Sequence, residues 1–204
     1  YALSNNHIYA DENLAAIGDD VIQPGTIDGG SSPADDIGTL ADFETIVFST
    51  SANNVIDAAI ASSTTAQLGN ATPSDGYGEP QSVSISPAVG MAVMKYGRTT
   101  GETKALITAI NATVNVGYGS EGTARFINQI VIGSRGFSSG GDSGSLIVCD
   151  DETKSGKGRN KKVVQGPDHL RPVGLLYAGS SSSTIANPIG PVLTRFGVTV
   201  DGSQ

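Results

Sequence analysis

A serine flanked by glycines stands out in the second half of this 204-residue chain. Residues 140–145 read Gly-Gly-Asp-Ser-Gly-Ser, with Ser143 as the first serine of the segment. Glycines beside a serine remove the Cβ atoms that would keep the backbone away from a substrate. Backbone N–H groups that come this close can stabilise the oxyanion of a tetrahedral intermediate. The segment therefore indicates acyl transfer with Ser143 as the nucleophile.

A serine nucleophile needs a base and an orienting carboxylate, because its hydroxyl reacts poorly near neutral pH. A flexible glycine-rich turn would have the same composition, so these partners decide between the two interpretations. The chain has two histidines, His7 in Ser-Asn-Asn-His-Ile and His169 in Asp-His-Leu-Arg. Either one, taken by itself, could be an ordinary structural histidine.

Asp57 interrupts an apolar run, Val-Ile-Asp-Ala-Ala-Ile-Ala, at residues 55–61. A carboxylate buried there without a partner would be costly, and a histidine partner would remove that cost. We therefore expect Asp57 to lie at the end of a strand or in a turn.

His7, Asp57 and Ser143 occur in the order His, Asp, Ser, each in a context that resembles the trypsin- and chymotrypsin-like serine peptidases. Two further segments are similar to the disulfide-free branch of this family, found in bacteria and in plant narrow-leaf type proteins. They read Lys-Tyr-Gly-Arg-Thr-Thr-Gly at 95–101 and Gly-Leu-Leu-Tyr-Ala-Gly-Ser at 174–180. The resemblance covers nearly the whole chain. It implies an all-β fold with two Greek-key β-barrels, and a serine endopeptidase that hydrolyses protein substrates through an acyl-enzyme intermediate.

The resemblance also implies a role for each matching residue. Ser143 would be the nucleophile, His7 the general base and then acid, and Asp57 the carboxylate that orients the imidazole. The N–H groups of Gly141 and Ser143 would form the oxyanion hole. A catalytically silent module of the same fold, which binds peptides or partner proteins, is the alternative, because one fold carries many functions.

The same comparison of motifs suggests how a substrate would be selected. It places Phe137 at the floor of the pocket for the side chain before the scissile bond, with Ala178 and Gly179 as an open wall. Cleavage after Lys or Arg would call for an aspartate at that floor. We therefore expect a modest apolar side chain in this pocket.

Asp142 directly precedes the proposed nucleophile. In this family the corresponding aspartate often receives a new N-terminal ammonium on activation, so maturation by proteolysis is one expectation. Tyr1 lies so few residues before His7 that its amine should stay near the histidine. We therefore expect Arg135 or backbone groups to satisfy Asp142.

Strand signals dominate the second half of the chain. Short β-branched or alternating runs, punctuated by Gly, Pro, Asn and Ser, predict strands. These runs lie at residues 82–86, 89–94, 105–116, 126–132, 146–148 and 173–177. A closing helix is predicted at 189–196, after Pro188.

The chain divides at a polar connector rich in Pro and Gly. Residues 1–72 are expected to form the N-terminal barrel portion with His7 and Asp57, residues 73–87 the connector, and residues 88–204 the C-terminal barrel with Ser143. The family normally has strands before the histidine, so the first barrel should lack its N-terminal strands here. An upstream N-terminal fragment or an adjoining chain is the expected partner that completes it.

Composition limits the other partners. The formal net charge is -8, so nucleic acid is not an expected partner, and no apolar run approaches a membrane span. No metal and no cofactor are predicted, because Cys-x-x-Cys, His-Glu-x-x-His and Walker-type patterns do not occur. The single cysteine, Cys149, rules out an intrachain disulfide and reads as a buried strand-end residue. This favours a cytoplasmic setting, bacterial or intracellular, without excluding secretion.

Basic residues gather in one stretch, 151–172, which reads as an inserted, mobile surface loop. They are Lys154, Lys157, Arg159, Lys161, Lys162 and Arg171. The loop could gate the cleft, bind an acidic partner, serve as a processing site or be a solvated hairpin extension.

Overall fold

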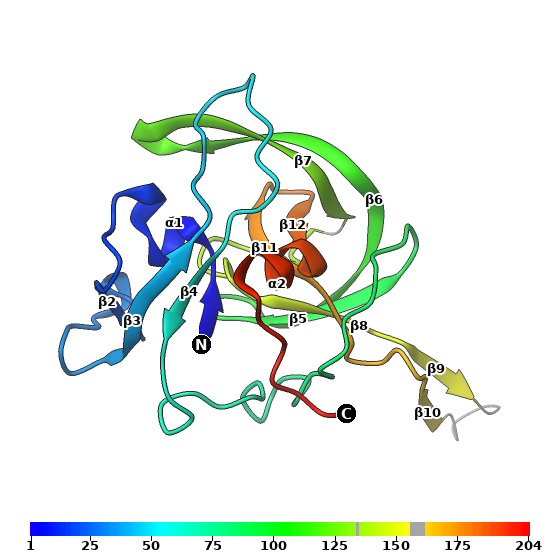
Figure 1. Cartoon of the computed structure of the whole chain (residues 1–204). Coiled ribbons are helices and arrows are strands. Elements are labelled where there is room, and N and C mark those ends of the chain that lie inside the picture. The colour runs from blue at the N-terminus through cyan, green and yellow to red at the C-terminus, as the bar shows by residue number, and fades with distance from the viewer. Residues whose placement is uncertain (134, 156–161) are drawn as a thin grey trace.

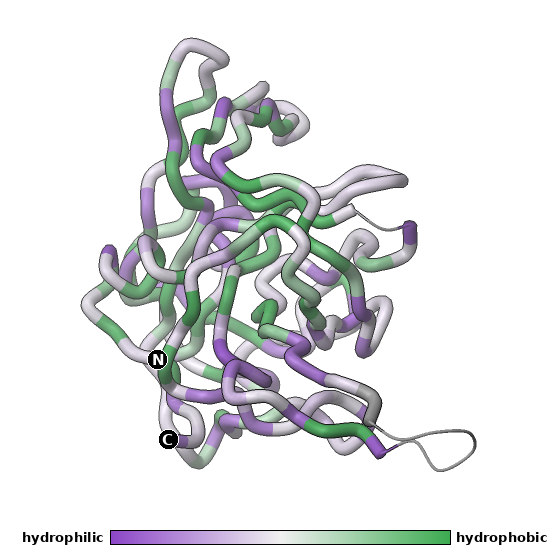
Figure 2. Tube along the Cα trace, turned by 90° about the vertical axis from the view of Figure 1, so that its right-hand side faces the viewer, coloured by the Kyte–Doolittle hydropathy of each residue, from purple (hydrophilic) through white to green (hydrophobic). Residues whose placement is uncertain are grey.

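The structure is a computed structural model, which describes residues 1–133, 135–155 and 162–204. Antiparallel strands make up both halves of the molecule, with few helices (Figure 1). The all-β prediction is confirmed. Figure 2 shows the most hydrophobic stretches along the strands in the interior of the molecule.

The N-terminal half is an open four-stranded sheet in the order β1-β4-β3-β2. The strands are β1 (Ala2–Ser4), β2 (Asp20–Ile22), β3 (Asp36–Phe43) and β4 (Ala59–Ser62). Within the described ranges, no strand pairs with the outer edge of β1 or of β2. The first barrel is therefore incomplete in this chain, as predicted.

Short helical segments connect these strands. Helix α1 (Asn6–Tyr9) directly follows β1, and 3-10 turns lie at Asp11–Asn13 and Thr26–Asp28. The start of α1 is fixed because the carbonyl of Asn5 accepts the N–H groups of Ile8 and Tyr9, at 3.2 and 3.0 Å. This one-turn helix carries His7.

The C-terminal half is a closed barrel in the order β11-β12-β7-β6-β5-β8. Its strands are β5 (Ala92–Gly97), β6 (Gly101–Tyr118), β7 (Gly122–Gly133), β8 (Leu146–Cys149), β11 (Pro172–Gly179) and β12 (Thr184–Pro188). Helix α2 (Ile189–Phe196) closes the chain, as predicted. The barrel interior is filled by buried side chains that include Val93, Ile107, Ile130, Ile132, Phe137, Ile147 and Leu176.

Strands β6 and β7 are long and meet at a 3-10 turn, Gly119–Glu121. Alternate side chains of β6 are more deeply buried along much of its length, as expected for a strand with one face on a core. The hairpin reaches the first half of the chain, where the Asn54 N–H donates to the carbonyl of Arg125 at 3.0 Å. It brings Tyr118 next to Asp57.

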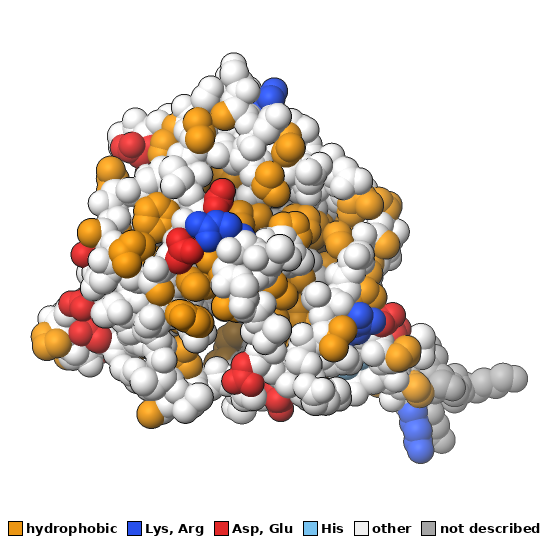
Figure 3. Space-filling model, viewed as in Figure 1, with side chains coloured by type: hydrophobic (Ala, Val, Ile, Leu, Met, Phe, Trp, Pro, Cys, Tyr) orange, Lys and Arg blue, Asp and Glu red, His pale blue; other side chains and the backbone are white. Residues whose placement is uncertain are grey.

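Helix α2 also joins the two halves. Its Arg195 pairs with Asp42 at 2.8 Å and with Glu44 at 2.5 Å, both from the first half. Below these contacts, a cavity of about 320 Å³ is lined by Leu3 and Ile60 from the sheet and by Leu146, Leu175 and Leu193 from the barrel and α2. Figure 3 shows hydrophobic side chains around a hollow on this face.

The strand predictions for the barrel are confirmed in β5, β6, β7, β8 and β11. The strand predicted at 82–86 is wrong. Its backbone makes single contacts instead, from the Ser82 N–H to Ser203 and from the Ile85 N–H to Pro172. It runs between the C-terminal segment and β11 without a partner that continues alongside it.

The basic stretch contains a separate two-stranded hairpin, β9 (Glu152–Ser155) and β10 (Lys162–Gln165), which projects from the barrel (Figure 1). Lys157, Arg159 and Lys161 lie outside the described residues. Cys149 is buried at the end of β8, as predicted, and burial raises the pKa of its thiol to about 11. Within the described part of the chain, neither helix has the length and apolar character to cross a membrane.

Candidate active site

The structure brings His7 and Asp57 together across 50 residues of sequence. The imidazole Nδ1 lies 2.6 Å from Asp57 Oδ2, and Asp57 Oδ1 accepts the backbone N–H of His7 at 3.3 Å. A carboxylate can only accept hydrogen bonds, so Nδ1 carries the hydrogen and Nε2 has a free lone pair. The pair therefore presents the tautomer that a general base requires.

Asp57 is fully buried, and its backbone is fixed by two asparagines. The side-chain amides of Asn5 and Asn187 donate to its carbonyl at 2.8 and 2.9 Å. Asn187 Oδ1 also accepts the Asp57 N–H at 3.2 Å. Because Asn5 follows β1 and Asn187 belongs to β12, these bonds tie both halves of the chain to the carboxylate.

A third donor to the carboxylate is the Tyr118 hydroxyl, 2.9 Å from Asp57 Oδ2. Burial and the negative charge of Asp57 raise the pKa of Tyr118, so the phenol stays protonated and can only donate here. Its ring also lies edge-on to His7, with centroids 6.0 Å apart. Tyr118 thus helps to hold both members of the pair.

Ser143 lies in a turn that packs against the segment leading to His7. The next residue, Gly144, donates its N–H to the carbonyl of Leu176 at 2.8 Å. A Cβ atom at Gly144 would come within 2.4 Å of Ser4 Oγ. Since Ser4 is three residues before His7, the turn lies beside the strand end that precedes α1.

The Ser143 side chain is partly exposed. Among the residues that the structure describes, no hydrogen bond joins its hydroxyl to His7. Catalytic hydrogen bonds are often long before substrate binds and tighten in the complex. The structure thus shows an oriented imidazole, and a partly exposed Ser143 in a turn beside the strand that leads to His7.

The backbone around Ser143 has free donors. Asp142, Gly144 and Ser145 each donate their N–H to a carbonyl, whereas within the described ranges the N–H groups of Gly141 and Ser143 donate to none. Free N–H groups of the nucleophile itself and of the residue two positions before it are suited to bind an oxyanion. Gly141 has a φ of +95°, a conformation that other residues adopt only at a cost.

Gly144→Ala is expected to destabilise the protein and to disturb the site. The residue has a φ of +84°, and the added methyl would collide with Ser4. The left-handed backbone alone costs about 1–2 kcal/mol for a residue with a Cβ. Thermal unfolding measures the loss.

Gly190→Ala is the matched control, because a Cβ there meets nothing within 4 Å and the residue lies inside α2. That change should be neutral or stabilising by about 0.5–1 kcal/mol. Equal stability of the two variants would contradict the close packing of the turn on Ser4.

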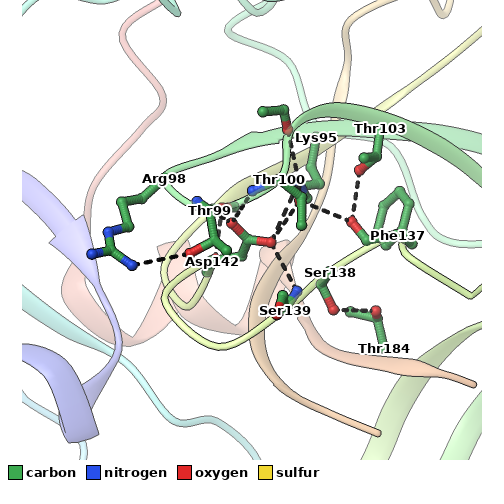
Figure 4. A network of polar contacts seen from close by, with 12 residues as sticks. Lys95, Arg98, Thr99, Thr100, Thr103, Phe137, Ser138, Ser139, Asp142 and Thr184 are labelled. Atoms are coloured by element: carbon green, nitrogen blue, oxygen red, sulfur yellow. Dashed lines mark hydrogen bonds and ion pairs between the residues drawn. The ribbon is translucent and has the colours of Figure 1, made fainter. Parts of the chain in front are cut away.

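Asp142 is fully buried beneath the turn and accepts several hydrogen bonds (Figure 4). The N–H groups of Thr99 and Ser139 donate to its carboxylate at 2.8 and 2.9 Å, and the Thr100 hydroxyl donates at 2.7 Å. The predicted backbone donors are therefore present. A cation that the sequence analysis missed is also present, because Lys95 Nζ lies 3.6 Å from Asp142 Oδ2.

Lys95 is fully buried as well, with its ammonium enclosed by acceptors. Besides Asp142, it donates to the Thr100 hydroxyl and to the carbonyl of Gly101. Burial lowers the pKa of Lys95, although Asp142 acts in the opposite sense. Burial would raise the pKa of Asp142, but the hydrogen bonds from Thr100, Ser139 and Thr99 outweigh it and leave that pKa below its usual value.

No protein-family model and no curated protein matches the sequence. Solved structures do match over almost the whole chain. The chymotrypsin of Cellulomonas bogoriensis is 20% identical, with a TM-score of 0.59 over 98% of this chain and 85% of that one. Protease A of Thermobifida fusca is 21% identical, with a TM-score of 0.59 over 98% and 84%. The fold is that of the chymotrypsin-like serine proteases.

A glutamic acid-specific serine protease that uses a histidine triad in substrate binding has the same fold. It is 23% identical, with a TM-score of 0.58 over 97% of this chain and 84% of that one. Within the chymotrypsin-like fold of this chain, His7 and Asp57 come from the open sheet region and Ser143 from the closed barrel. Contacts between the two halves are made at Asp57, which accepts hydrogen bonds from Asn187 and Tyr118, and at Gly144, which lies against Ser4.

A cavity of about 310 Å³ opens beside the Ser143 turn. It is lined by Ser138, Ser139, Gly140, Gly179, Ser180 and Ser181. Gly179 is on its wall, whereas Ala178 and Phe137 are not among the lining residues. The Phe137 ring is 1% exposed and packs in the barrel core with Val93 and Ile107. Serine hydroxyls take the place of the aromatic floor that was expected.

His169 lies at the far end of β8 from Ser143, where Leu170 donates its N–H to the carbonyl of Cys149. With Asp150 and Glu152 it forms a group whose ligand atoms lie within 4.8 Å of one another. Lys104 Nζ donates to both carboxylates, at 2.9 and 3.2 Å. The Lys104 ammonium thus already offsets part of the negative charge that would attract a metal ion.

Sequence reasoning missed the residues that support the candidate site. Lys95 and Asn187 each interrupt an apolar strand, the signal that drew attention to Asp57. A buried polar residue implies a partner. Tyr118 gave no comparable signal, because a tyrosine at a strand end is common and its contact with Asp57 depends on the tertiary fold.

Proposed function

We propose that the protein is a serine endopeptidase that hydrolyses peptide bonds in protein substrates. The observation that carries the proposal is the 2.6 Å contact between His7 Nδ1 and the buried Asp57 carboxylate, which leaves Nε2 free to accept a proton. Structural similarity to known serine proteases supports it, although the identities are low. The unengaged N–H groups of Gly141 and Ser143 fit the same chemistry.

In the proposed reaction, Ser143 Oγ attacks the carbonyl carbon of the scissile bond while His7 Nε2 takes the hydroxyl proton. Gly141 and Ser143 donate to the resulting oxyanion, and Asp57 stabilises the imidazolium. His7 then gives its proton to the leaving amine, and the C–N bond breaks to leave an acyl-enzyme. Water, deprotonated by His7, attacks the ester carbonyl, and His7 returns the proton to Ser143 Oγ as the C–O bond breaks and the acid product is released.

Lys95 bears on how such a site would be activated. Its ammonium already supplies a positive charge to Asp142 from inside the chain, beneath the turn that carries Gly141 and Ser143. This favours a site that is organised without a new N-terminal ammonium. Proteolytic maturation is then not needed to order the turn.

The second candidate is a catalytically silent module that binds peptides or partner proteins. The observation in its favour is that Ser143 and His7 share no hydrogen bond among the described contacts. The histidine-based substrate binding of the glutamic acid-specific neighbour does not transfer to this chain. Only two histidines occur here, so a histidine triad for substrate binding cannot form.

The open edges of β1 and β2 support a further part of the proposal. Unpaired strand edges invite pairing with another chain segment. We propose that additional strands, from an upstream segment of the polypeptide or from an adjoining chain, complete the first barrel in the active protein.

A fluorophosphonate probe tests the endopeptidase proposal, because it reacts only with an activated serine. We expect the wild-type protein to be labelled, and Ser143→Ala and His7→Ala to lose labelling. His169→Ala should label like the wild type, since it lies at the other end of β8. A wild-type protein that binds peptides and is never labelled would support the silent module instead.

A further inference from the structure

The hydroxyl-lined cavity beside Ser143 has a polar inner wall. Ser138 Oγ and Thr184 Oγ1 are hydrogen-bonded to each other, as Figure 4 shows. Thr184 is 1% exposed, whereas Ser138 is partly exposed and lines the cavity. Each hydroxyl has one hydrogen and two lone pairs, so this contact leaves Ser138 with further capacity to bond an incoming group.

The opposite wall carries a hydroxyl that is arranged to donate. Ser180 Oγ accepts the backbone N–H groups of Ser182 and Ser183, both at 3.3 Å. With two N–H groups on its oxygen, Ser180 has its hydrogen left to offer. Ser183 Oγ lies 3.1 Å from Ser180 Oγ and can accept this hydrogen until a ligand takes its place.

Gly179 lies close to the wall that carries Ser138. A Cβ atom built at Gly179 would lie 3.4 Å from Ser138 Oγ and 3.1 Å from the carbonyl of Ser183. A substrate side chain that enters beside Gly179 would therefore pass within reach of Ser138. The absence of a side chain at this position keeps the cavity open.

No charged residue lines the cavity among those described. Lys95, the buried ammonium beneath the turn, lies 5.9 Å from the centroid of the Phe137 ring and is already paired with Asp142. A carboxylate or ammonium group that entered would lose water without gaining an opposite charge. A large apolar side chain would instead strip water from the serine hydroxyls and leave them unpaired.

We propose that this cavity selects an uncharged carboxamide side chain, that of glutamine or asparagine, immediately before the scissile bond. This inference rests on the proposed endopeptidase function. A carboxamide offers an acceptor to Ser180 and donors to Ser138, so it can satisfy both walls at once. The proposal replaces the modest apolar preference expected from the sequence, because Phe137 lies in the core.

Quenched-fluorescence peptides that differ only at this position test the proposal. We expect kcat/KM for Gln or Asn to exceed that for Leu, Glu and Lys by about 10-fold or more, the effect of one or more hydrogen bonds. Ser138→Ala should lower kcat/KM for the Gln peptide by about 10-fold more than for an Ala peptide, which has no carboxamide to bond. Ser74→Ala, an exposed serine in the connector, is the matched control and should change neither.

Gly179→Val provides an independent variant, because its side chain would fill the space beside Ser138. It should abolish the preference for Gln while the Ala peptide is still cleaved. Leu, Glu or Lys as the best residue, or a Ser138→Ala variant that slows every peptide equally, would overturn the proposal.

A binding measurement separates this inference from the proposed function. Peptides that end in Gln should bind to Ser143→Ala about 10-fold more tightly than peptides that end in Leu, measured by titration calorimetry. If the wild type is not labelled by the fluorophosphonate but this preference is found, the endopeptidase proposal fails and the pocket assignment stands. If the wild type is labelled and no preference is found in either assay, only the pocket assignment fails.

Discussion

Asp57→Asn is expected to lower kcat/KM for a cleaved peptide by about 10⁴-fold. The asparagine has the same shape and keeps its backbone contacts with Asn5 and Asn187. Its amide nitrogen can donate, however, and would favour the His7 tautomer with a hydrogen on Nε2. That tautomer cannot take the proton of Ser143. Steady-state kinetics measure the loss, and thermal unfolding shows that the fold is retained.

Tyr118→Phe measures how much the hydrogen bond from Tyr118 contributes while the charged carboxylate of Asp57 is kept. The ring and its contact with His7 remain, but the hydrogen bond to Asp57 Oδ2 is lost. We expect a decrease of about 10-fold in kcat/KM, much smaller than for Asp57→Asn. Asp201→Asn removes an exposed carboxylate and should have no effect. Near wild-type activity of Asp57→Asn would exclude Asp57 as the group that orients His7.

The residues that could be found from sequence are those whose type conflicts with their surroundings. Asp57 sits in an apolar run, and the structure buries it and gives it an imidazole partner. Ser143 lies among glycines that we interpret from the sequence as permitting close approach of the backbone, and one of them, Gly144, lies so close to Ser4 that a Cβ atom would collide. Such positions are detectable because burial of a polar group, or a glycine at a tight contact, is costly without a specific reason.

Strands were predictable where their apolar residues pack on one barrel. β6, β7 and β8 contain long or dense apolar patterns, and all were found. β1 and β2 have three residues each, too few to show an alternation. The segment 82–86 shows the opposite failure, because it alternates like a strand but meets different parts of the chain at Ser82 and Ile85. Pairing depends on neighbours that a local pattern does not contain.

The cavity beside the Ser143 turn shows why a position matched by motif does not fix a side chain's direction. Phe137 is adjacent to Ser138 in the chain, yet Ser138 faces the cavity and the Phe137 ring faces the barrel core. The strong preference of an aromatic ring for the interior explains the difference. Gly179, which has no side chain to redirect, lines the cavity.

Lys95→Met is expected to destabilise the protein by about 3–5 kcal/mol, the usual result of removing one partner of a buried ion pair. Methionine has a similar length and fills the space, so the loss comes mainly from the uncompensated charge of Asp142. The turn above Asp142 carries the N–H groups of Gly141 and Ser143. We expect this turn to become disordered in Lys95→Met, which should slow fluorophosphonate labelling by about 100-fold, comparable to the loss of one oxyanion donor. Urea unfolding and labelling rates measure the two effects.

Two further variants test the origin of this loss. Lys104→Met removes a lysine that pairs with Asp150 and Glu152 but is 43% exposed, so it should cost less than about 1 kcal/mol. The double variant Lys95→Met/Asp142→Asn removes both buried charges and should recover part of the stability lost in Lys95→Met. Equal losses for Lys95→Met and Lys104→Met would contradict a buried, coupled pair.

The pH dependence of stability distinguishes the ion pair from simple packing. Because the pKa of Asp142 is lowered in the folded protein, its stabilising contribution is complete above the unfolded pKa and is lost as pH falls through the folded pKa. Removing the ammonium of Lys95 raises the pKa of Asp142, so acid unfolding of Lys95→Met should begin at a higher pH than in the wild type. The pKa of Lys95 is also lowered, so wild-type stability should rise as pH increases from the folded toward the unfolded pKa of this lysine. That alkaline rise should disappear in Lys95→Met, whereas a loss of packing alone would shift the whole stability curve without changing its shape.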